Sequence, residues 1–377
     1  MIKEPSFSIG IEEEYLLVDR ETRDLISEAP LTMLGECEKL LERQVTPEFL
    51  QSQIEVGTRV CKTLGEARDD LLHLRKCVSD IAGRHGLAII ASSTHPFATW
   101  GTQRHTEKQR YAVLARDMQA VAKRLLISGM HVHVGIDDDE LRIDLMDQAA
   151  YALPHFLVLS TSSPFWEGVN TGLKSYRVAV WNSLPRTGLP EQFDSYAEFQ
   201  RHVDMLVKAG VIEDGTKIWW DLRPSMRFPT LEMRITDICT RLEDGLCIAA
   251  LYRCWLRMLY RLRKKNQRWR TYANMLINEN RWRAERYGFD EGLIDFSKGC
   301  IVPYADLLEE ILALVIEDAG YFGCVPEVQH ARKILERGTS AHWQIKTYED
   351  AKAGGASHED ALKAVVDMLI EQTMHGV

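Results

Sequence analysis

The stretch Phe7–Asp19, FSIGIEEEYLLVD, decides the architecture expected for the chain. Five of its apolar side chains fall on one face at a period of two: Phe7, Ile9, Ile11, Tyr15 and Leu17. This alternation predicts a β-strand with one buried face. Glu12 and Glu14 share the opposite face, where two carboxylates repel each other unless solvent or a cation lies between them. We favour a divalent cation, because later stretches supply matching ligands.

Three later stretches repeat this division into an apolar and a polar face: Thr46–Thr58, Ile127–Ile136 and Thr230–Asp237. Their polar faces carry Glu55, then His131 with His133, then Glu232 with Arg234. If the four strands are neighbours in one sheet, these side chains line a single cleft. Carboxylates with an occasional imidazole suit Mg²⁺ or Mn²⁺. Such ions beside an arginine are what phosphoryl transfer from ATP requires.

Each feature alone also has a simpler explanation. One glutamate on an edge strand commonly protects that edge from pairing, two alternate histidines are commonly half-buried, and an arginine beside a glutamate can serve a surface ion pair. All of these explanations would have to hold together on four strands. The metal hypothesis is favoured on that ground, and it depends on the strands being adjacent.

The rest of the sequence predicts an α+β fold. Further strands are expected at 87–93 and 217–223. Helices are expected at 64–83, 106–126, 195–209 and 240–270. The last two of these helices begin with capping boxes at Ser195 and Thr240. From Thr271 onwards only helices are expected, at 272–287, 303–319, 326–337 and 357–372. We therefore predict one catalytic domain over 1–377, with a mostly antiparallel sheet in 1–270, helices on one face of it, and a helical segment in 271–377. The long irregular segment 163–190, rich in aromatic residues and arginine, is expected to be functional.

Composition narrows the class of protein. The 377 residues carry a formal net charge of −9, which argues against general binding to nucleic acid or to a membrane surface. None of the eight cysteines forms a C-x-x-C pair, so a reduced, cytoplasmic protein without a structural zinc site is expected. The first ten residues lack the apolar core of a signal peptide.

An ordered set of motifs resembles one known family. GIEEEYLLVD, PEFLQSQIEVGT, ASSTHPF, GMHVHVGI, SPFWEG with TGLKSYR, LPRTGLP, DLRPS, LEMRITD and NRWRAERYG follow one another along the chain. Each motif is weak alone, and the ordered set is specific. Together they are similar to the type 2 glutamate–cysteine ligase family, the YbdK-type carboxylate–amine ligases, over residues 7 to about 290.

The resemblance implies a glutamine-synthetase-like fold with a curved antiparallel sheet. It implies that ATP joins the glutamate γ-carboxylate to the amine of cysteine through γ-glutamyl phosphate, with Mg²⁺ or Mn²⁺ as cofactor and often as a homodimer. By motif position the metal ligands are Glu12, Glu14, Glu48, Glu55, His131 and Glu232. Arg234 would contact the transferring phosphoryl group. Glu48 and Glu55 fall on opposite pleats of an ideal strand, so a bulge or turn is expected between them. Glu13 points with the apolar face and receives no metal.

Substrate binding calls for further cations. Arg177 and Arg186 in the irregular segment are expected to clamp substrate anions, with loop stabilisation through backbone carbonyls as the equal alternative. Arg223 is the second candidate for the phosphoryl-stabilising role. A ligase for another amine acceptor and a guanidino phosphotransferase remain the alternative functions.

Overall fold

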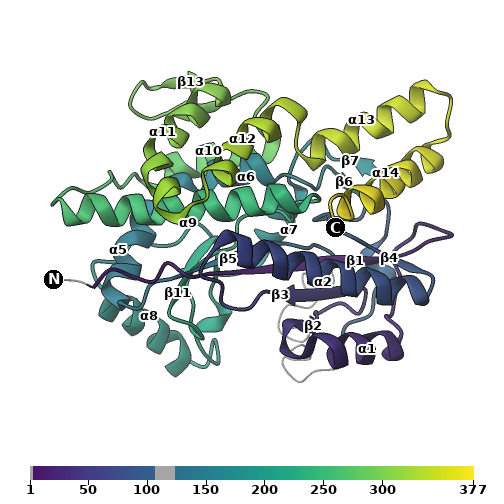
Figure 1. The fold of residues 1–377 in the computed structure, drawn as a ribbon, viewed down its shortest axis with the longest axis horizontal. Helices are drawn as coiled ribbons and strands as arrows, with labels where there is room; N and C mark the ends of the chain where they lie inside the picture. The colour runs from purple at the N-terminus through teal and green to yellow at the C-terminus, as the bar shows by residue number, and fades with distance from the viewer. Residues whose placement is uncertain (1–2, 107–123) are drawn as a thin grey trace.

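An antiparallel sheet of seven strands runs through the centre of the molecule (Figure 1). The computed structural model describes residues 3–106 and 124–377, so most of the helix expected at 106–126 lies outside the described residues. The strands of this sheet are β1 (Ile9–Asp19), β2 (Val45–Pro47), β3 (Gln53–Gly57), β4 (Leu87–Ile90), β5 (Met130–Gly135), β10 (Leu222–Pro224) and β11 (Thr230–Met233). Their order is β10-β11-β5-β1-β3-β2, with β4 also paired to β1.

Strand β1 is central because it pairs with three others, β3, β4 and β5, always antiparallel. Its burial follows the expected alternation: Ile9, Ile11 and Tyr15 are fully buried, whereas Glu12 and Glu14 are partly exposed. The four strands that share an apolar and a polar face are therefore neighbours. The adjacency on which the metal hypothesis depended is present, and the mostly antiparallel α+β class is confirmed.

Twelve α-helices of the described residues surround the sheet or join its strands. Six of these α-helices precede β11, the last strand of this sheet in the chain: α1 (Leu31–Leu41), α2 (Leu64–Arg84), α5 (Asp139–Ala149), α6 (Leu153–Ser160), α7 (Tyr176–Trp181) and α8 (Tyr196–Lys208). Those after it are α9 (Leu242–Lys264), α10 (Asn274–Tyr287), α11 (Tyr304–Phe322), α12 (Val325–Arg337), α13 (Ser340–Ala353) and α14 (His358–Thr373). Short 3₁₀ turns lie at Glu42–Gln44, Trp100–Thr102, Ala150–Ala152 and Gly215–Lys217.

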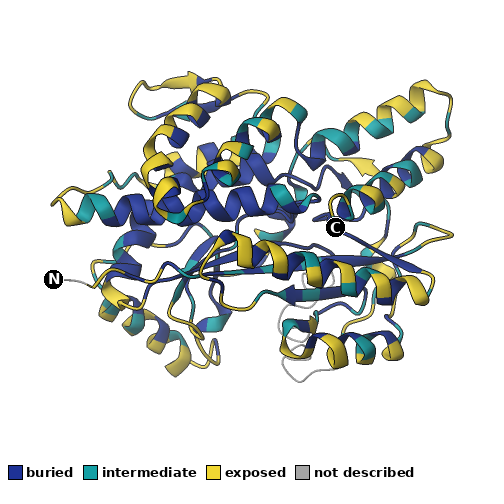
Figure 2. Cartoon of the chain, viewed as in Figure 1, coloured by how far each residue is buried: buried dark blue, intermediate teal, exposed yellow. Residues whose placement is uncertain are grey.

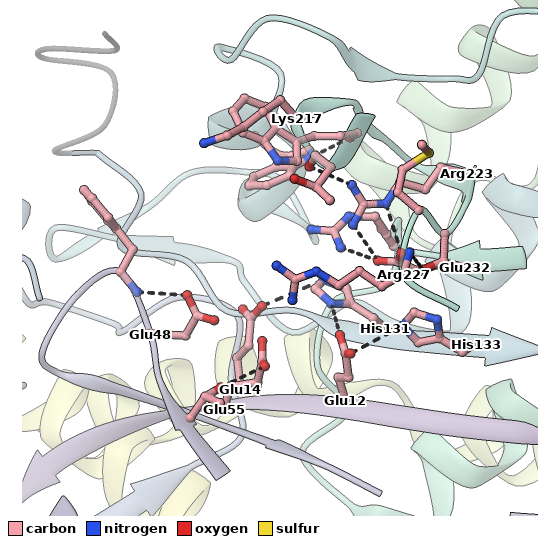
Figure 3. Close-up of a pocket in the computed structure, with 18 of the residues that line it drawn as sticks. Glu12, Glu14, Glu48, Glu55, His131, His133, Lys217, Arg223, Arg227 and Glu232 are labelled. Carbon is pink, nitrogen blue, oxygen red and sulfur yellow. Dashed lines mark hydrogen bonds and ion pairs between the residues drawn. The ribbon is translucent and has the colours of Figure 1, made fainter. Parts of the chain in front are cut away.

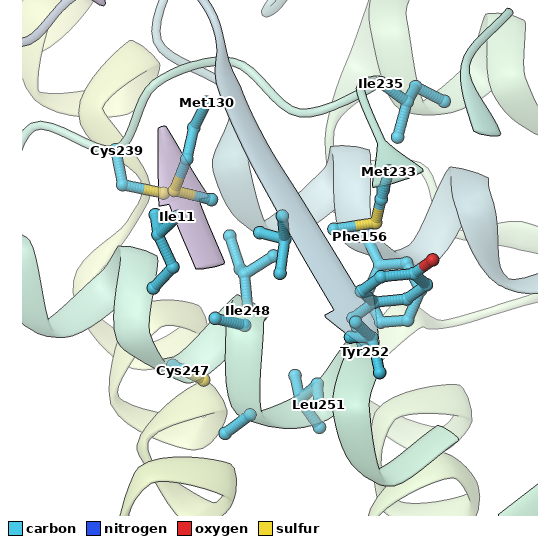
Figure 4. Close-up of a cluster of buried hydrophobic side chains, with 14 of the residues drawn as sticks. Ile11, Met130, Phe156, Met233, Ile235, Cys239, Cys247, Ile248, Leu251 and Tyr252 are labelled. Carbon is cyan, nitrogen blue, oxygen red and sulfur yellow. The ribbon is translucent and has the colours of Figure 1, made fainter. Parts of the chain in front are cut away.

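Helices α2 and α9 cover the apolar face of the sheet (Figure 1). Every residue of α9 from Asp244 to Tyr260 is buried (Figure 2), as expected for a helix that lies between a sheet and a second layer of helices. Close approach to β5 is possible because Gly245 has no side chain: an added Cβ would lie 3.1 Å from Met130 Sδ. Apolar side chains from β1, β5, β11, α6 and α9 fill this layer (Figure 4).

The acid that falls on the apolar face, Glu13, has a buried partner. Both of its carboxylate oxygens accept hydrogen bonds from the Arg75 guanidinium of α2, at 2.7 and 2.9 Å, and the Tyr15 hydroxyl donates a third. Arg75 also donates to the carbonyl oxygens of Cys239 and Thr240. The ion pair thus ties the middle of β1 to α2 and to the segment that leads into α9.

The C-terminal third differs in two respects from the expectation of helices alone. Strands β12 (Leu293–Asp295) and β13 (Cys300–Val302) form a hairpin, and α13 is an additional helix. Three-residue strands are too short to display alternation. Helix α13 buries only Ser340, Ala341 and Gln344, so it offers no apolar periodicity. These helices pack on the core: α10 contacts α6, α11 and α12 contact α9, and α14 contacts β4.

Three local predictions, on the stretch 46–58, the start of α9 and the segment 163–190, differ from the structure. The stretch expected as one strand over 46–58 is β2 and β3 with a turn between them, which is the interruption that the Glu48 spacing required. Thr240 does not cap α9: Arg241 is the N-cap residue, and the Thr240 hydroxyl donates to the carbonyl oxygen of Ala91. The segment 163–190 contains α7, a small hairpin of β6 (Phe165–Trp166) and β7 (Val169–Asn170), and β8 (Thr187–Gly188), which pairs with β9 (Trp219–Trp220). No described helix has the length and apolarity needed to cross a membrane.

Candidate active site

A pocket of about 430 Å³ lies on the polar face of the sheet (Figure 3). Strands β1, β3, β5, β10 and β11 all contribute to its lining, together with the turn after β2 and the loop between β10 and β11. Its acidic and imidazole side chains are Glu12, Glu14, Glu48, Glu55, Glu232, His131 and His133. All six residues expected to bind metal therefore line one pocket.

The register of the sheet explains why these side chains meet. Directly opposed residues of adjacent antiparallel strands place their side chains on the same face. Glu12 of β1 is paired with His131 of β5, and Glu14 of β1 with Glu55 of β3. Glu232 of β11 is paired with His133. Because the four strands alternate with a period of two and are paired in this register, their ligand-type side chains form a row across one face of the sheet.

The first cluster consists of Glu12, His131 and Glu232, each of which offers a ligand atom within 4.8 Å of the others. His131 Nδ1 lies 3.0 Å from a Glu12 oxygen. Burial opposes ionisation of Glu12, but hydrogen bonds from His131 and His133 hold the pKa of its carboxyl well below the usual range. Burial, together with the charge of Arg234, lowers the pKa of His131 to about 4. The imidazole is therefore neutral at pH 7, which is the form that binds metal.

The second cluster consists of Glu14, Glu48 and Glu55, again with ligand atoms within 4.8 Å of one another. Burial and the charge of Glu48 raise the pKa of Glu14 to about 8. The same two causes raise the pKa of Glu55 well above its ordinary value. Glu14 and Glu55 thus resist ionisation, and a divalent cation would stabilise their charged forms. The carboxylate oxygens of the three residues match the ligands preferred by Mg²⁺ and Mn²⁺.

Two arginines meet at Glu232. Arg223 donates to both carboxylate oxygens, at 3.0 and 3.1 Å, and Arg234 makes a short contact with one of them. These two cations hold the pKa of the Glu232 carboxyl far below its ordinary value, although burial acts against them. Arg223 is also fixed by the carbonyl oxygens of Thr216 and Ile218. The Nε of Arg234, by contrast, is buried and has no hydrogen-bond partner among the described residues.

The two arginines expected to clamp substrate lie outside this pocket. Arg177 is buried and donates to the carbonyl oxygens of Arg234 and Ile235. Arg186 donates to the carbonyl oxygen of Lys217 and lies 5.4 Å from the Trp219 ring centroid. Both follow the alternative in which they stabilise backbone carbonyls. Their position in an aromatic-rich loop near the motifs suggested substrate contact. In the structure Arg177 is buried in the loop interior, whereas Arg186 is partly exposed at a different pocket.

The pocket also contains residues that the sequence did not single out. Gln53, Trp181, Lys217, Trp219 and Arg227 all contribute to its lining. Trp181 lies under Arg234, with its ring centroid 5.8 Å from the guanidinium carbon, and its indole nitrogen donates to the carbonyl oxygen of Trp219. Gln53 lies on β3 two residues before Glu55, so the alternation of that strand places both on the same face. The other four lie at the end of α7, in a 3₁₀ turn, in the two-residue strand β9 and in a loop, where no strand periodicity marks the side chain that faces the site.

The antiparallel sheet with this pocket on its polar face is the glutamine-synthetase-like fold. A solved glutamate–cysteine ligase from Francisella tularensis, determined in complex with AMP, superposes with a TM-score of 0.71 over 99% of this chain and 90% of that chain. The two sequences are 14% identical, so the likeness shows a shared fold.

Sequence comparison then gives the family. The model of glutamate–cysteine ligase family 2 matches residues 8–367, and the chain belongs to that family. A protein of Rhodospirillum rubrum named "Putative glutamate–cysteine ligase 2" is 60% identical over 99% of this chain and 97% of its own length. A Jannaschia protein of the same name is 55% identical over 97% of this chain and 96% of its own. The resemblance drawn from the motifs is confirmed.

Proposed function

We propose that this protein is an ATP-dependent carboxylate–amine ligase that joins the γ-carboxylate of glutamate to the amine of cysteine. A carboxylate is a poor electrophile, and its phosphorylation by ATP creates a leaving group. The amine then attacks γ-glutamyl phosphate, the new amide bond forms, and ADP and phosphate are the other products. The family of the chain supports this reaction, as do the names of its relatives.

The observation that carries the proposal is the pair of acidic clusters on one face of the sheet. Glu12, His131 and Glu232 fit one divalent ion, and Glu14, Glu48 and Glu55 fit a second. Mg²⁺ or Mn²⁺ held there would supply positive charge that offsets the charge of the ATP phosphates. The donor set fits such ions, since it combines five carboxylates with a neutral imidazole and includes no thiolate.

Within this proposal the chain's own cations have separate tasks. Arg223 keeps the Glu232 carboxylate in place through two hydrogen bonds and is itself fixed by two carbonyl oxygens. Arg234 lies beside the same carboxylate and keeps an unpartnered Nε–H. Arg234 is therefore the group that can donate to a phosphoryl oxygen, where charge develops during transfer. Arg177 supports it by binding its carbonyl oxygen.

Phosphate release measured with ATP, glutamate and a panel of amines tests the function. We expect release that depends on Mg²⁺ or Mn²⁺, that requires glutamate, and that is fastest with cysteine, together with γ-glutamylcysteine identified by mass spectrometry. Phosphate release with another amine, together with its γ-glutamyl amide, would replace cysteine as the acceptor. ATP turnover with a guanidino acceptor and no amide product would favour a phosphotransferase.

A further inference from the structure

The loop that joins β10 to β11 projects into the pocket. Met226, Arg227 and Phe228 at its tip all line the pocket, and Figure 3 shows Arg227 among the side chains that line it. The backbone of the loop is fixed. Ser225 N–H donates to the carbonyl oxygen of Thr230 at 3.0 Å, and Pro229 accepts from Ile136 N–H at 2.8 Å. The tip is thus held in place over the acidic face of the sheet.

Arg227 differs from every other arginine at this pocket. Arg223 and Arg234 are both bound to Glu232. The guanidinium of Arg227 is exposed, and it has no hydrogen-bond or ion-pair partner in the part of the chain that the structure describes. Lys217, the remaining cation of the lining, lies 3.7 Å from Glu213. Arg227 therefore has a complete set of donors directed to the pocket and no protein group to receive them.

The substrates of the proposed reaction carry anionic groups that a free guanidinium could bind. Both amino acids carry an α-carboxylate that takes no part in the chemistry, and a carboxylate accepts two parallel hydrogen bonds from one guanidinium. Arg177 and Arg186 donate to backbone carbonyls and do not line this pocket, so they do not fill this role there. Once metal ions neutralise the glutamates, the charge of Arg227 is free to attract a substrate anion.

We infer that Arg227 binds the α-carboxylate of an amino-acid substrate and thereby selects amino acids over simple acids or amines. This inference rests on the proposed function. The α-carboxylates of glutamate and cysteine have the same chemistry, and the experiment distinguishes them. Arg227 touches substrate in this scheme but not the reacting atoms, so its loss affects substrate affinity far more than turnover.

The test compares the unmodified enzyme with R227M and R227K in phosphate-release kinetics at saturating Mg²⁺. R201M is the matched control, since Arg201 is an exposed arginine on α8 that lines neither this pocket nor a neighbouring one. We expect R227M to raise KM for glutamate or for cysteine about ten- to a hundredfold, the loss expected for hydrogen bonds between charged groups. The kcat and the KM for ATP should stay within about twofold, and R227K should recover part of the affinity.

Substrates that lack one carboxylate identify which amino acid is bound. 4-Aminobutyrate lacks the α-carboxylate of glutamate, and cysteamine lacks that of cysteine. R227M should impose no further penalty on the analogue that lacks the recognised carboxylate. Three results would each overturn the inference: an equal rise in KM for the parent substrates and for both analogues, a rise confined to the KM for ATP, or unchanged KM values.

Calorimetric binding of each amino acid, with Mg²⁺ and a non-hydrolysable ATP analogue present, separates this inference from the proposed function. Absence of ligase activity in the unmodified enzyme would refute the function. Weaker binding of one amino acid by R227M than by R201M would still support the role of Arg227. Equal binding by the two variants, or no binding of either amino acid by the unmodified protein, would overturn it.

Discussion

Replacement of Arg234 by alanine is expected to lower kcat far more than it lowers stability. Arg234 contacts one oxygen of Glu232, whereas Arg223 holds both through two hydrogen bonds. The Glu232 carboxylate therefore keeps a buried partner in R234A. Loss of one hydrogen bond between charged groups costs about 1.5–3 kcal/mol of folding free energy, so the variant should remain folded.

The catalytic loss should be larger. An arginine that stabilises charge on a transferring phosphoryl group contributes about a thousandfold or more in turnover, which corresponds to about 4 kcal/mol of transition-state free energy. The unpartnered Nε–H of Arg234 is lost in both R234A and R234K. Lysine restores the charge but not the planar array of donors, so R234K should recover only part of the rate.

Steady-state phosphate release and circular dichroism check these expectations together. R234A should reduce kcat about a thousandfold, with a much smaller change in the KM for glutamate and an unchanged spectrum. R223M serves as the contrast, because Arg223 also supports two backbone carbonyls and its loss should reduce stability as well as rate. A normal kcat in R234A would show that Arg234 is only a structural partner of Glu232, and the phosphoryl-stabilising role would pass to Arg223.

Three other predictions concern stability, pH and assembly. R75M leaves the buried carboxylate of Glu13 without its cation, which should lower the free energy of unfolding in urea by about 3–5 kcal/mol. The double variant E13Q/R75M should recover much of that loss. An equal loss of stability in both variants would contradict the pairing argument. In the metal-free protein Glu14 has a pKa of about 8 against an ordinary value near 4.5. The folded state therefore holds a proton that the unfolded state releases, and stability should fall by up to about 1.4 kcal/mol per pH unit between about pH 5 and 8. Mn²⁺ should reverse this fall, and a metal-free stability that rises over the same range would refute the assigned pKa direction. We also propose a homodimer, since Met275 and Tyr321 leave large apolar side chains exposed; sedimentation as a monomer at micromolar concentration would argue against it.

The amino-acid sequence by itself determined the architecture and most of the acidic residues of the site. Alternation at a period of two marked Glu12, Glu14, Glu55, His131 and Glu232, because a strand places alternate side chains on opposite faces and one face must be apolar to be buried. Glu48 came only from the family resemblance. It lies in the turn after β2, where no period constrains the direction of a side chain.

Only the tertiary structure showed what the other arginines near the site contact. Alternation with Glu232 marked Arg234 in the sequence, whereas Arg177, Arg186 and Arg223 were candidates from their place near motifs and Arg227 was not marked. The structure directs Arg177 and Arg186 to backbone carbonyls, places Arg223 and Arg234 on Glu232, and leaves Arg227 free at a loop tip. An arginine side chain is long and flexible, so its partner is fixed by whichever acceptors the folded chain brings within reach. That selection depends on contacts between distant segments, and local sequence patterns do not record it.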